Sequence, residues 1–312
     1  MKFSILIPTH DQRDTVVEAV ASALAQEHGD FEVVVSDDAS TDGTPDVVAA
    51  LPPDPRLSLH RGRANVGRVA NYRRCLYEFA RGDYVLMLDG DDVLVCRDYL
   101  SRAERLIDRH HVPLVFGRVE ARDAATGLPR GGGDLNRDLA PLLDGDALFL
   151  RLGTGRVALL HLGCVYDRRR AIALDFYRAD ILSSDFESLH RLIIGAQVGF
   201  VDVVAGVWRR HEASAVSRAR PAERLANLRS VTGPYEHALA SGRFSRAVLR
   251  RWLRRALVRA ARPDLAAILR AGDRGVALAY LREVRRWSPA AWVQLLGSRR
   301  VLRAWPRALR RA

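Results

Sequence analysis

Short apolar runs of strand character alternate with helical patterns through the first 120 residues of the chain. The expected strands are residues 3–8, 31–36, 56–60, 84–88 and 114–119. Between the strands, apolar residues recur every three or four positions in 16–24 and in 68–79, which predicts two helices. The second helix carries its apolar face on Val69, Tyr72, Leu76 and Phe79. This alternation predicts an α/β fold, with a mainly parallel sheet flanked by helices.

Polar loops follow three of the expected strands. They contain Pro8-Thr9-His10-Asp11, then Asp37 and Asp38, then Asp89-Gly90-Asp91-Asp92. In an open α/β sheet, the loops beyond the carboxyl ends of the strands form the ligand crevice. Three carboxylates held so close together repel one another unless a cation offsets their charge. The last loop therefore favours Mg²⁺ or Mn²⁺ with phosphate oxygens as further ligands, and a solvated helix-capping turn is the alternative.

Asp37 and Asp38 are suited to accept hydrogen bonds from a base and from ribose hydroxyls. The alternative is a helix cap, because Ser40, Thr41 and Asp42 also precede a helical run. Asn65 and Gly67 are typical of a tight turn into the next helix. None of these residues decides the function by itself.

The order of the motifs resembles the inverting family 2 glycosyltransferases of the GT-A fold. The resemblance rests on residues 4–9 and 35–42, Asn65-Val66-Gly67 with Asn71, Gly82-Asp83-Tyr84, and 88–92. Several motifs in the family's order at plausible spacing are more specific than any one of them. The match is close over residues 1–110 and continues more weakly to residue 217.

The resemblance implies a role for each matched residue. Asp38, with Thr9, would contact the base and ribose of a nucleotide sugar, Asp91 would hold the metal, and Asp89 would assist at the ribose or metal. The remaining residues assigned to the donor site are Pro8, Asp11, Asp37, Asn65, Gly67, Asn71 and Gly90. Asp11 stands where the family commonly has asparagine.

Two segments further along the chain resemble the rest of the family's active site. Asp185 takes the position of the catalytic base, although Ser184 precedes it where the family commonly has glutamate. Glu187 is the alternative base. His211, which follows two arginines, is the candidate second metal ligand. In an inverting transfer one carboxylate removes the proton of the acceptor hydroxyl as that oxygen attacks the sugar.

The net charge of +12 is concentrated in the C-terminal part of the chain. Residues 1–200 carry −6 and residues 201–312 carry +18. We therefore expect a catalytic domain at 1–217 and a basic helical region at 218–312. From Phe244 onward, Trp and Leu alternate with Arg in amphipathic patterns, which are divided into short helices by Pro263, Gly272, Gly275, Pro289 and Pro306. These helices suit either internal packing or an anionic membrane surface, and no nucleic-acid motif accompanies the charge.

The leading hypothesis is a metal-dependent enzyme that transfers a single sugar from a nucleotide-diphosphate sugar, with UDP favoured, to a glycan, lipid-linked saccharide or small acceptor. A processive synthase is disfavoured because the sequence has no spanning helix and no Q-x-x-R-W segment. The alternatives are a sugar-phosphate nucleotidylyltransferase and a non-catalytic nucleotide-sugar-binding or membrane-scaffolding protein. Three scattered cysteines and the absence of a signal peptide predict a cytoplasmic protein, with peripheral contact at the inner face of the membrane.

Overall fold

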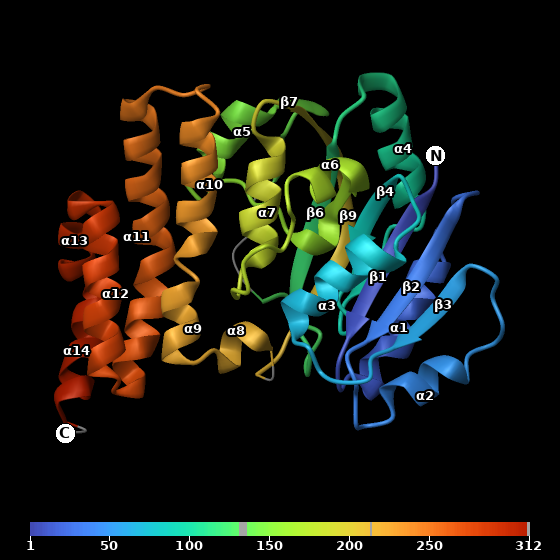
Figure 1. The fold of residues 1–312 in the computed structure, drawn as a ribbon, viewed down its shortest axis with the longest axis horizontal. Coiled ribbons are helices and arrows are strands. Elements are labelled where there is room, and N and C mark those ends of the chain that lie inside the picture. Colours follow the sequence, from blue (N-terminus) through green and yellow to red (C-terminus); the bar gives the residue numbers. More distant parts are fainter. Residues whose placement is uncertain (131–135, 213, 311–312) are drawn as a thin grey trace. The chain divides into compact units, whose positions relative to one another are not determined.

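The computed structural model describes residues 1–130, 136–212 and 214–310, with side chains in the last helix as far as Ala304 (Figure 1). The chain divides into two compact units. Unit 1 comprises Met1–Gly145, Ala158–Asp180 and Gly195–His211, and unit 2 comprises Asp146–Val157, Ile181–Ile194 and Glu212–Ala312. The domain boundary expected between residues 217 and 218 stays a prediction, because contacts in the folded chain do not test which segment folds by itself.

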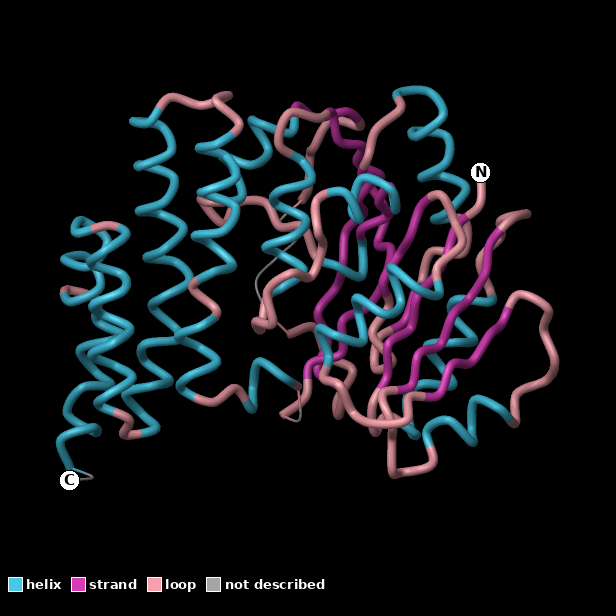
Figure 2. The backbone as a smooth tube through the Cα atoms, in the orientation of Figure 1, coloured by secondary structure: helices cyan, strands magenta, loops and turns pink. Residues whose placement is uncertain are grey.

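The described strands of unit 1 form one mixed sheet in the order β3-β2-β1-β4-β8-β6-β9-β5, with β7 beside β9 (Figure 2). The strands are β1 (Phe3–Thr9), β2 (Phe31–Asp37), β3 (Leu57–Arg61), β4 (Tyr84–Met87), β5 (Val93–Leu94), β6 (Leu114–Asp123), β7 (Leu142–Asp144), β8 (Cys164–Asp167) and β9 (Gln197–Arg210). The five strands that the sequence predicts are confirmed, and each begins within one residue of its expected start.

The parallel arrangement that we expect holds for the first four strands. Strands β3, β2, β1 and β4 are parallel neighbours. Both β1 and β4 are buried along their whole length. Strands that are covered on both faces read as continuous apolar runs, which is why they were recognisable. Beyond β4 the sheet becomes mixed, because β8 pairs antiparallel with β4 and β6 while β6 and β9 are parallel.

Helices of unit 1 flank this sheet. They are α1 (Arg13–Leu24), α2 (Thr44–Ala49), α3 (Arg68–Arg74), α4 (Tyr99–His110) and α6 (Arg168–Ala173), with a 3-10 turn at His161–Gly163. The helix expected over 68–79 is present, but its second part, Cys75–Phe79, is a π-helix. The buried apolar residues of α1 and α4 join those of β1 and β2 in one core.

Unit 2 is helical in its described residues. It contains α5 (Gly145–Leu152), α7 (Ser184–Ile193), α8 (Ala215–Arg218), α9 (Pro221–Ala226), α10 (Arg229–Ala240), α11 (Arg246–Ala271), α12 (Arg274–Trp287), α13 (Pro289–Leu296) and α14 (Arg299–Arg310). The expectation that Pro306 separates two helices is wrong, because α14 continues through it. The same expectation for Pro263 is also wrong, because α11 continues through it. Burial of Leu257, Leu265 and Leu269 on both sides offsets the roughly 3 kcal/mol that an internal proline costs.

The apolar stripe of α11 is used for packing within unit 2. Leu249, Trp252, Leu253 and Leu257 are all buried. The Trp252 ring stacks on Phe149 with centroids 4.4 Å apart, and its Nε1 donates a hydrogen bond of 2.8 Å to the Phe149 carbonyl. Because these residues are buried, this face of α11 is not an exposed apolar surface. Among the described residues, no helix combines the length and the apolar character needed to cross a bilayer.

A buried histidine lies on α7. His190 packs edge-on against Phe149 and Phe186, and neither ring nitrogen has a hydrogen-bond partner among the described residues. Burial lowers the pKa of His190 to about 3, and the Arg259 charge acts in the same direction. The native state therefore holds this imidazole neutral at any pH near 7.

We predict that His190 makes unit 2 less stable as the pH falls. An unfolded histidine binds a proton near pH 6.5, whereas the folded one does so only near pH 3. Between these values the unfolded state binds more protons, so the free energy of unfolding falls by up to roughly 1.4 kcal/mol per pH unit. Urea unfolding from pH 7 to pH 4 should show a shallower pH dependence in His190→Leu than in the wild type. His110→Leu, at a half-exposed position, should keep the wild-type slope, and an unchanged slope in His190→Leu would contradict the prediction.

Candidate active site

An acidic turn connects β4 to β5. Asp89, Asp91 and Asp92 each bring a carboxylate oxygen within 4.8 Å of the others. Burial raises the pKa of Asp89, and the Asp91 charge raises it further. Burial also raises the pKa of Asp92, with the charges of Asp91 and Asp89 adding to the effect. A divalent cation would relieve this repulsion, and carboxylate oxygens are the ligands that Mg²⁺ and Mn²⁺ prefer.

The end of β9 lies next to the acidic turn, although the two are far apart in the sequence. His211 Nε2 lies 2.8 Å from Asp91 Oδ2. The Arg209 backbone amide donates to Asp92 Oδ1 at 2.8 Å, and β5 pairs antiparallel with β9 next to it. An imidazole beside three carboxylates fits a Mn²⁺ or Mg²⁺ site, so the predicted metal residues Asp91 and His211 lie together.

Gly90 lies close against two side chains. A Cβ atom at this position would lie 2.5 Å from Gln12 Oε1 and 2.9 Å from Thr9 Oγ1, so any other residue would displace these side chains. The Thr9 hydroxyl donates to Gln12 Oε1 at 2.8 Å. The backbone of the acidic turn is therefore held against the loop after β1. Gln12 is missing from the residues that the sequence indicated, because a glutamine before a helix carries no specific signal.

Asp37, the last residue of β2, and Asp38, which follows it, have different hydrogen-bond partners. Asp38 accepts backbone hydrogen bonds from Val66 and Gly67, both of 2.9 Å, and Asn65 Oδ1 also accepts from Gly67. Gly67 has a φ of +93°, so a residue with a side chain would be strained there. Asp38, Asn65 and Gly67 thus form one turn. Asp37 is also buried; its Oδ2 accepts from the Ser40 amide at 3.2 Å, and its Oδ1 has no hydrogen-bond partner among the described residues.

Asn71 and Asp11 form hydrogen bonds with other residues of unit 1. The Asn71 side-chain amide exchanges two hydrogen bonds with Ser36, of 2.6 Å to its hydroxyl and 2.8 Å to its carbonyl. Asp11 accepts from the Thr41 amide at 2.8 Å and joins the loops after β1 and β2. Pro8 is buried in β1 and pairs with Ser36 in the sheet. These residues brace the loops.

Further residues support Asp89. The Tyr72 hydroxyl donates a 2.6 Å hydrogen bond to Asp89 Oδ1, and Arg68 Nη1 donates to the Tyr72 hydroxyl at 3.3 Å. His161 is half-buried next to the Tyr72 ring, and desolvation lowers the pKa of His161 to about 4 although the Asp89 charge opposes the shift. The sequence marks Tyr72 as part of an apolar helix face, so the role of its hydroxyl was not recognisable.

Asp185 belongs to unit 2 and lies in the first turn of α7, where its side chain is partly exposed. Glu187 is 2% exposed and forms a buried ion pair of 2.9 Å with Arg191 one turn later. Gly233 of α10 leaves room for Glu187, because a Cβ there would lie 2.7 Å from its Oε1. Of the two carboxylates, Asp185 is the one that a substrate in solvent can reach.

The model of the family described as Glycosyl transferase family 2 matches residues 4–149. The succinoglycan biosynthesis protein ExoO of Rhizobium meliloti is 39% identical over 109 residues, which are 34% of this chain and 29% of ExoO. The poly(ribitol-phosphate) beta-N-acetylglucosaminyltransferase TarS of Staphylococcus aureus is 34% identical over 122 residues, 38% of this chain and 21% of TarS. The chain thus matches less than a third of the length of these relatives.

Solved structures share the fold. TarS residues 1–349 in complex with UDP-GlcNAc superpose with a TM-score of 0.75 at 19% identity, covering 95% of this chain and 84% of that one. The mannosyltransferase PcManGT of Pyrobaculum calidifontis, in complex with GDP-Man and Mn²⁺, gives 0.56 at 20% identity, covering 98% and 86%. The expected α/β fold of the GT-A type, followed by a helical C-terminal region, is confirmed.

Proposed function

Because the chain belongs to glycosyl transferase family 2 through residues 4–149, we propose that it is a metal-dependent inverting glycosyltransferase. It transfers one sugar from a nucleotide-diphosphate sugar to a glycan, a lipid-linked saccharide or a small acceptor. The observation that carries this proposal is the acidic turn, in which Asp89, Asp91 and Asp92 converge and His211 lies 2.8 Å from Asp91.

The donor proposal rests on the chemistry of the site and on the neighbours of the fold. TarS 1–349 was solved with UDP-GlcNAc, and PcManGT with GDP-Man and Mn²⁺. In the present chain Thr9 ends β1, and its carbonyl accepts from the Asp38 amide at 2.9 Å, so these two residues lie together at the ends of neighbouring strands. We favour a UDP-linked sugar whose base and ribose contact Asp38 and Thr9, with Asp37 beside them.

The chemistry is divided among the chain's own residues. Asp91 and His211 would hold Mn²⁺ or Mg²⁺, with Asp89 at the metal or the ribose. The bound ion supplies positive charge that stabilises the leaving diphosphate. Tyr72 keeps the Asp89 carboxylate oriented by donating to it. Asp185 takes the proton of the acceptor hydroxyl as that oxygen forms the new glycosidic bond and the bond to the diphosphate breaks.

The acceptor and the location in the cell are part of the proposal. ExoO is named for succinoglycan biosynthesis and TarS for a poly(ribitol-phosphate) acceptor, which favours a cell-envelope glycan or its lipid-linked precursor. We propose that the enzyme works at the cytoplasmic face, where the basic C-terminal helices contact the membrane peripherally. Since the α11 stripe is buried, such contact uses exposed arginines rather than that apolar face.

Product analysis tests the proposed function against its alternatives. The full chain is incubated with Mn²⁺, a panel of nucleotide sugars and candidate acceptors, and the released phosphates are identified. We expect free UDP, formed faster with the correct acceptor, and a glycoside of inverted anomeric configuration. A parallel incubation with nucleoside triphosphates and sugar 1-phosphates would release pyrophosphate if the chain were a nucleotidylyltransferase. Donor binding without turnover for any acceptor would indicate a binding protein.

A further inference from the structure

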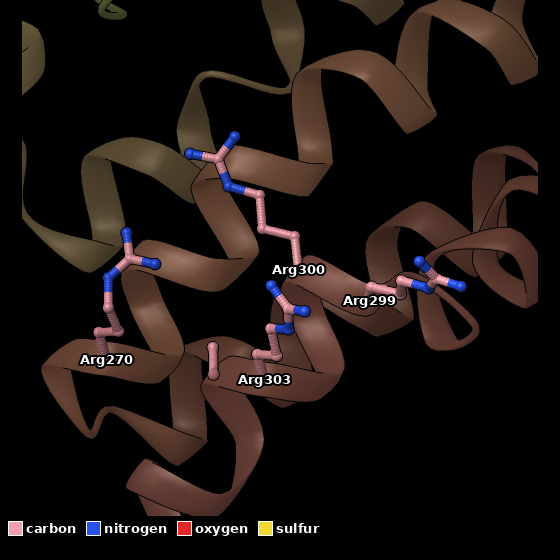
Figure 3. Close-up of a pocket in the computed structure, with 5 residues that line it drawn as sticks. Arg270, Arg299, Arg300 and Arg303 are labelled. Atoms are coloured by element: carbon pink, nitrogen blue, oxygen red, sulfur yellow. The ribbon is translucent and has the colours of Figure 1, made fainter.

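Four arginines surround a hollow at the C-terminal end of unit 2. Arg270 comes from the last turn of α11, and Arg299, Arg300 and Arg303 come from the first turns of α14. Together with Ala304 they line a space of about 390 Å³. In the view of Figure 3, the side chains of Arg270, Arg300 and Arg303 extend to the same side, whereas Arg299 extends away from them. The volume is within the range of small-molecule sites.

The acidic residues of this region are engaged elsewhere. The segment 241–312 contains three carboxylates. Asp264 pairs with Arg224 at 3.0 Å. Asp273 caps the N-terminus of α12, and Glu283 accepts a hydrogen bond from Trp287. Among the described residues, none of the four lining arginines has an ion pair with a carboxylate of the chain. Their positive charge therefore favours binding of an anionic ligand.

The helix geometry adds to the positive potential. A helix N-terminus carries a partial positive charge and backbone amides without intrahelical partners. Arg299 and Arg300 occupy this end of α14, where cations are unfavourable unless an anion binds. Arg270, at the C-terminal end of α11, is in the favourable position for a cation. Amides and guanidinium groups at a helix start are the arrangement that proteins use to bind phosphate.

We propose that the hollow lined by Arg270, Arg299, Arg300 and Arg303 is a binding site for phosphate or diphosphate groups. Guanidinium groups form paired hydrogen bonds with two phosphate oxygens, and several around one hollow favour a ligand with more than one negative charge. The source is a soluble phosphate or the phosphate of a lipid head group, since both present the same oxygens. The site lies wholly in unit 2, so the proposal does not depend on the function proposed above.

Calorimetric titration with inorganic pyrophosphate tests the site. The experiment uses the full chain in EDTA at fixed ionic strength, because without divalent metal the acidic turn cannot retain pyrophosphate. The variant Arg300→Gln/Arg303→Gln should bind at least tenfold more weakly than the wild type. The matched control, Arg251→Gln/Arg255→Gln, removes the same charge from exposed positions on α11 and should bind like the wild type. Equal weakening in both variants would overturn the proposal.

Vesicles distinguish the two sources of phosphate. Cosedimentation is measured with phosphatidylcholine vesicles and with vesicles that also contain phosphatidylglycerol. If pyrophosphate does not bind but anionic vesicles do, and the Arg300/Arg303 variant alone loses that binding, the ligand is a lipid head group. If neither probe binds, or if only an RNA oligonucleotide binds through these arginines, the proposal is wrong. Donor turnover should be the same in both double variants and the wild type.

Discussion

Replacing Asp91 by asparagine should reduce sugar transfer by roughly a thousandfold or more, which is the upper range for loss of one electrostatic contact to a developing charge. Asp91 lies beside His211 and shares the acidic turn with Asp89 and Asp92. The substitution keeps the shape of the side chain but removes the charge that would bind the metal. Affinity for Mn²⁺, measured by calorimetry, should fall together with transfer.

The control for Asp91→Asn is Asp46→Asn. Asp46 is an exposed carboxylate of α2 paired with Arg61, so the variant removes the same charge from unit 1 away from the acidic turn. It should transfer sugar like the wild type. Asp46→Asn should unfold at the wild-type temperature, and Asp91→Asn should unfold at a slightly higher temperature because the acidic turn loses charge repulsion. If Asp91→Asn kept full activity and full Mn²⁺ affinity, the assignment of Asp91 as a metal ligand would be wrong.

Replacing Asp185 by asparagine should lower the rate of transfer by about 10²- to 10⁴-fold, the usual contribution of a general base. Binding of the donor should be unchanged, because the carboxylate acts on the acceptor hydroxyl. Single-turnover rates and donor affinity, measured on the same preparation, separate these two effects.

Glu187→Gln should affect stability rather than catalysis, in contrast to Asp185→Asn. Glu187 is buried with Arg191, so its neutralisation leaves a buried guanidinium with less compensating charge. Removing one partner of such a pair typically costs about 3 to 5 kcal/mol, and the variant should show this in its free energy of unfolding. If instead Asp185→Asn keeps full transfer while Glu187→Gln folds normally and loses it, Glu187 is the base.

The first half of the fold was predictable from the sequence because its signals are local. Strands β1 and β2 consist mostly of buried apolar residues, and acidic residues occur where β2 ends and in the loop after β1. The order of these loops, with the acidic turn after β4, carried the resemblance to a family. The candidate metal residues Asp91 and His211 followed from that resemblance, and the structure places their side chains 2.8 Å apart although 120 positions separate them.

Other functions of the candidate residues depend on contacts that no local pattern records. Asp38 accepts the amides of Val66 and Gly67, so it also holds the turn that precedes α3. Asp37 has the same residue type and the same burial, but its Oδ2 accepts the Ser40 amide and its Oδ1 has no hydrogen-bond partner among the described residues. The partners of two adjacent carboxylates are decided by where the next loop folds.

By itself the sequence determined the α/β fold, the parallel half of the sheet, the acidic turn and the uneven distribution of charge. Only the tertiary structure decided which charges are compensated. In the folded chain Glu187 is buried with Arg191, and the apolar stripe of α11 packs within unit 2. Arg270 and Arg300 line one hollow, and among the described residues no carboxylate lines it. The physical reason is that periodicity and propensity act over a few residues, whereas burial and Coulomb interactions depend on distances between segments far apart in the chain.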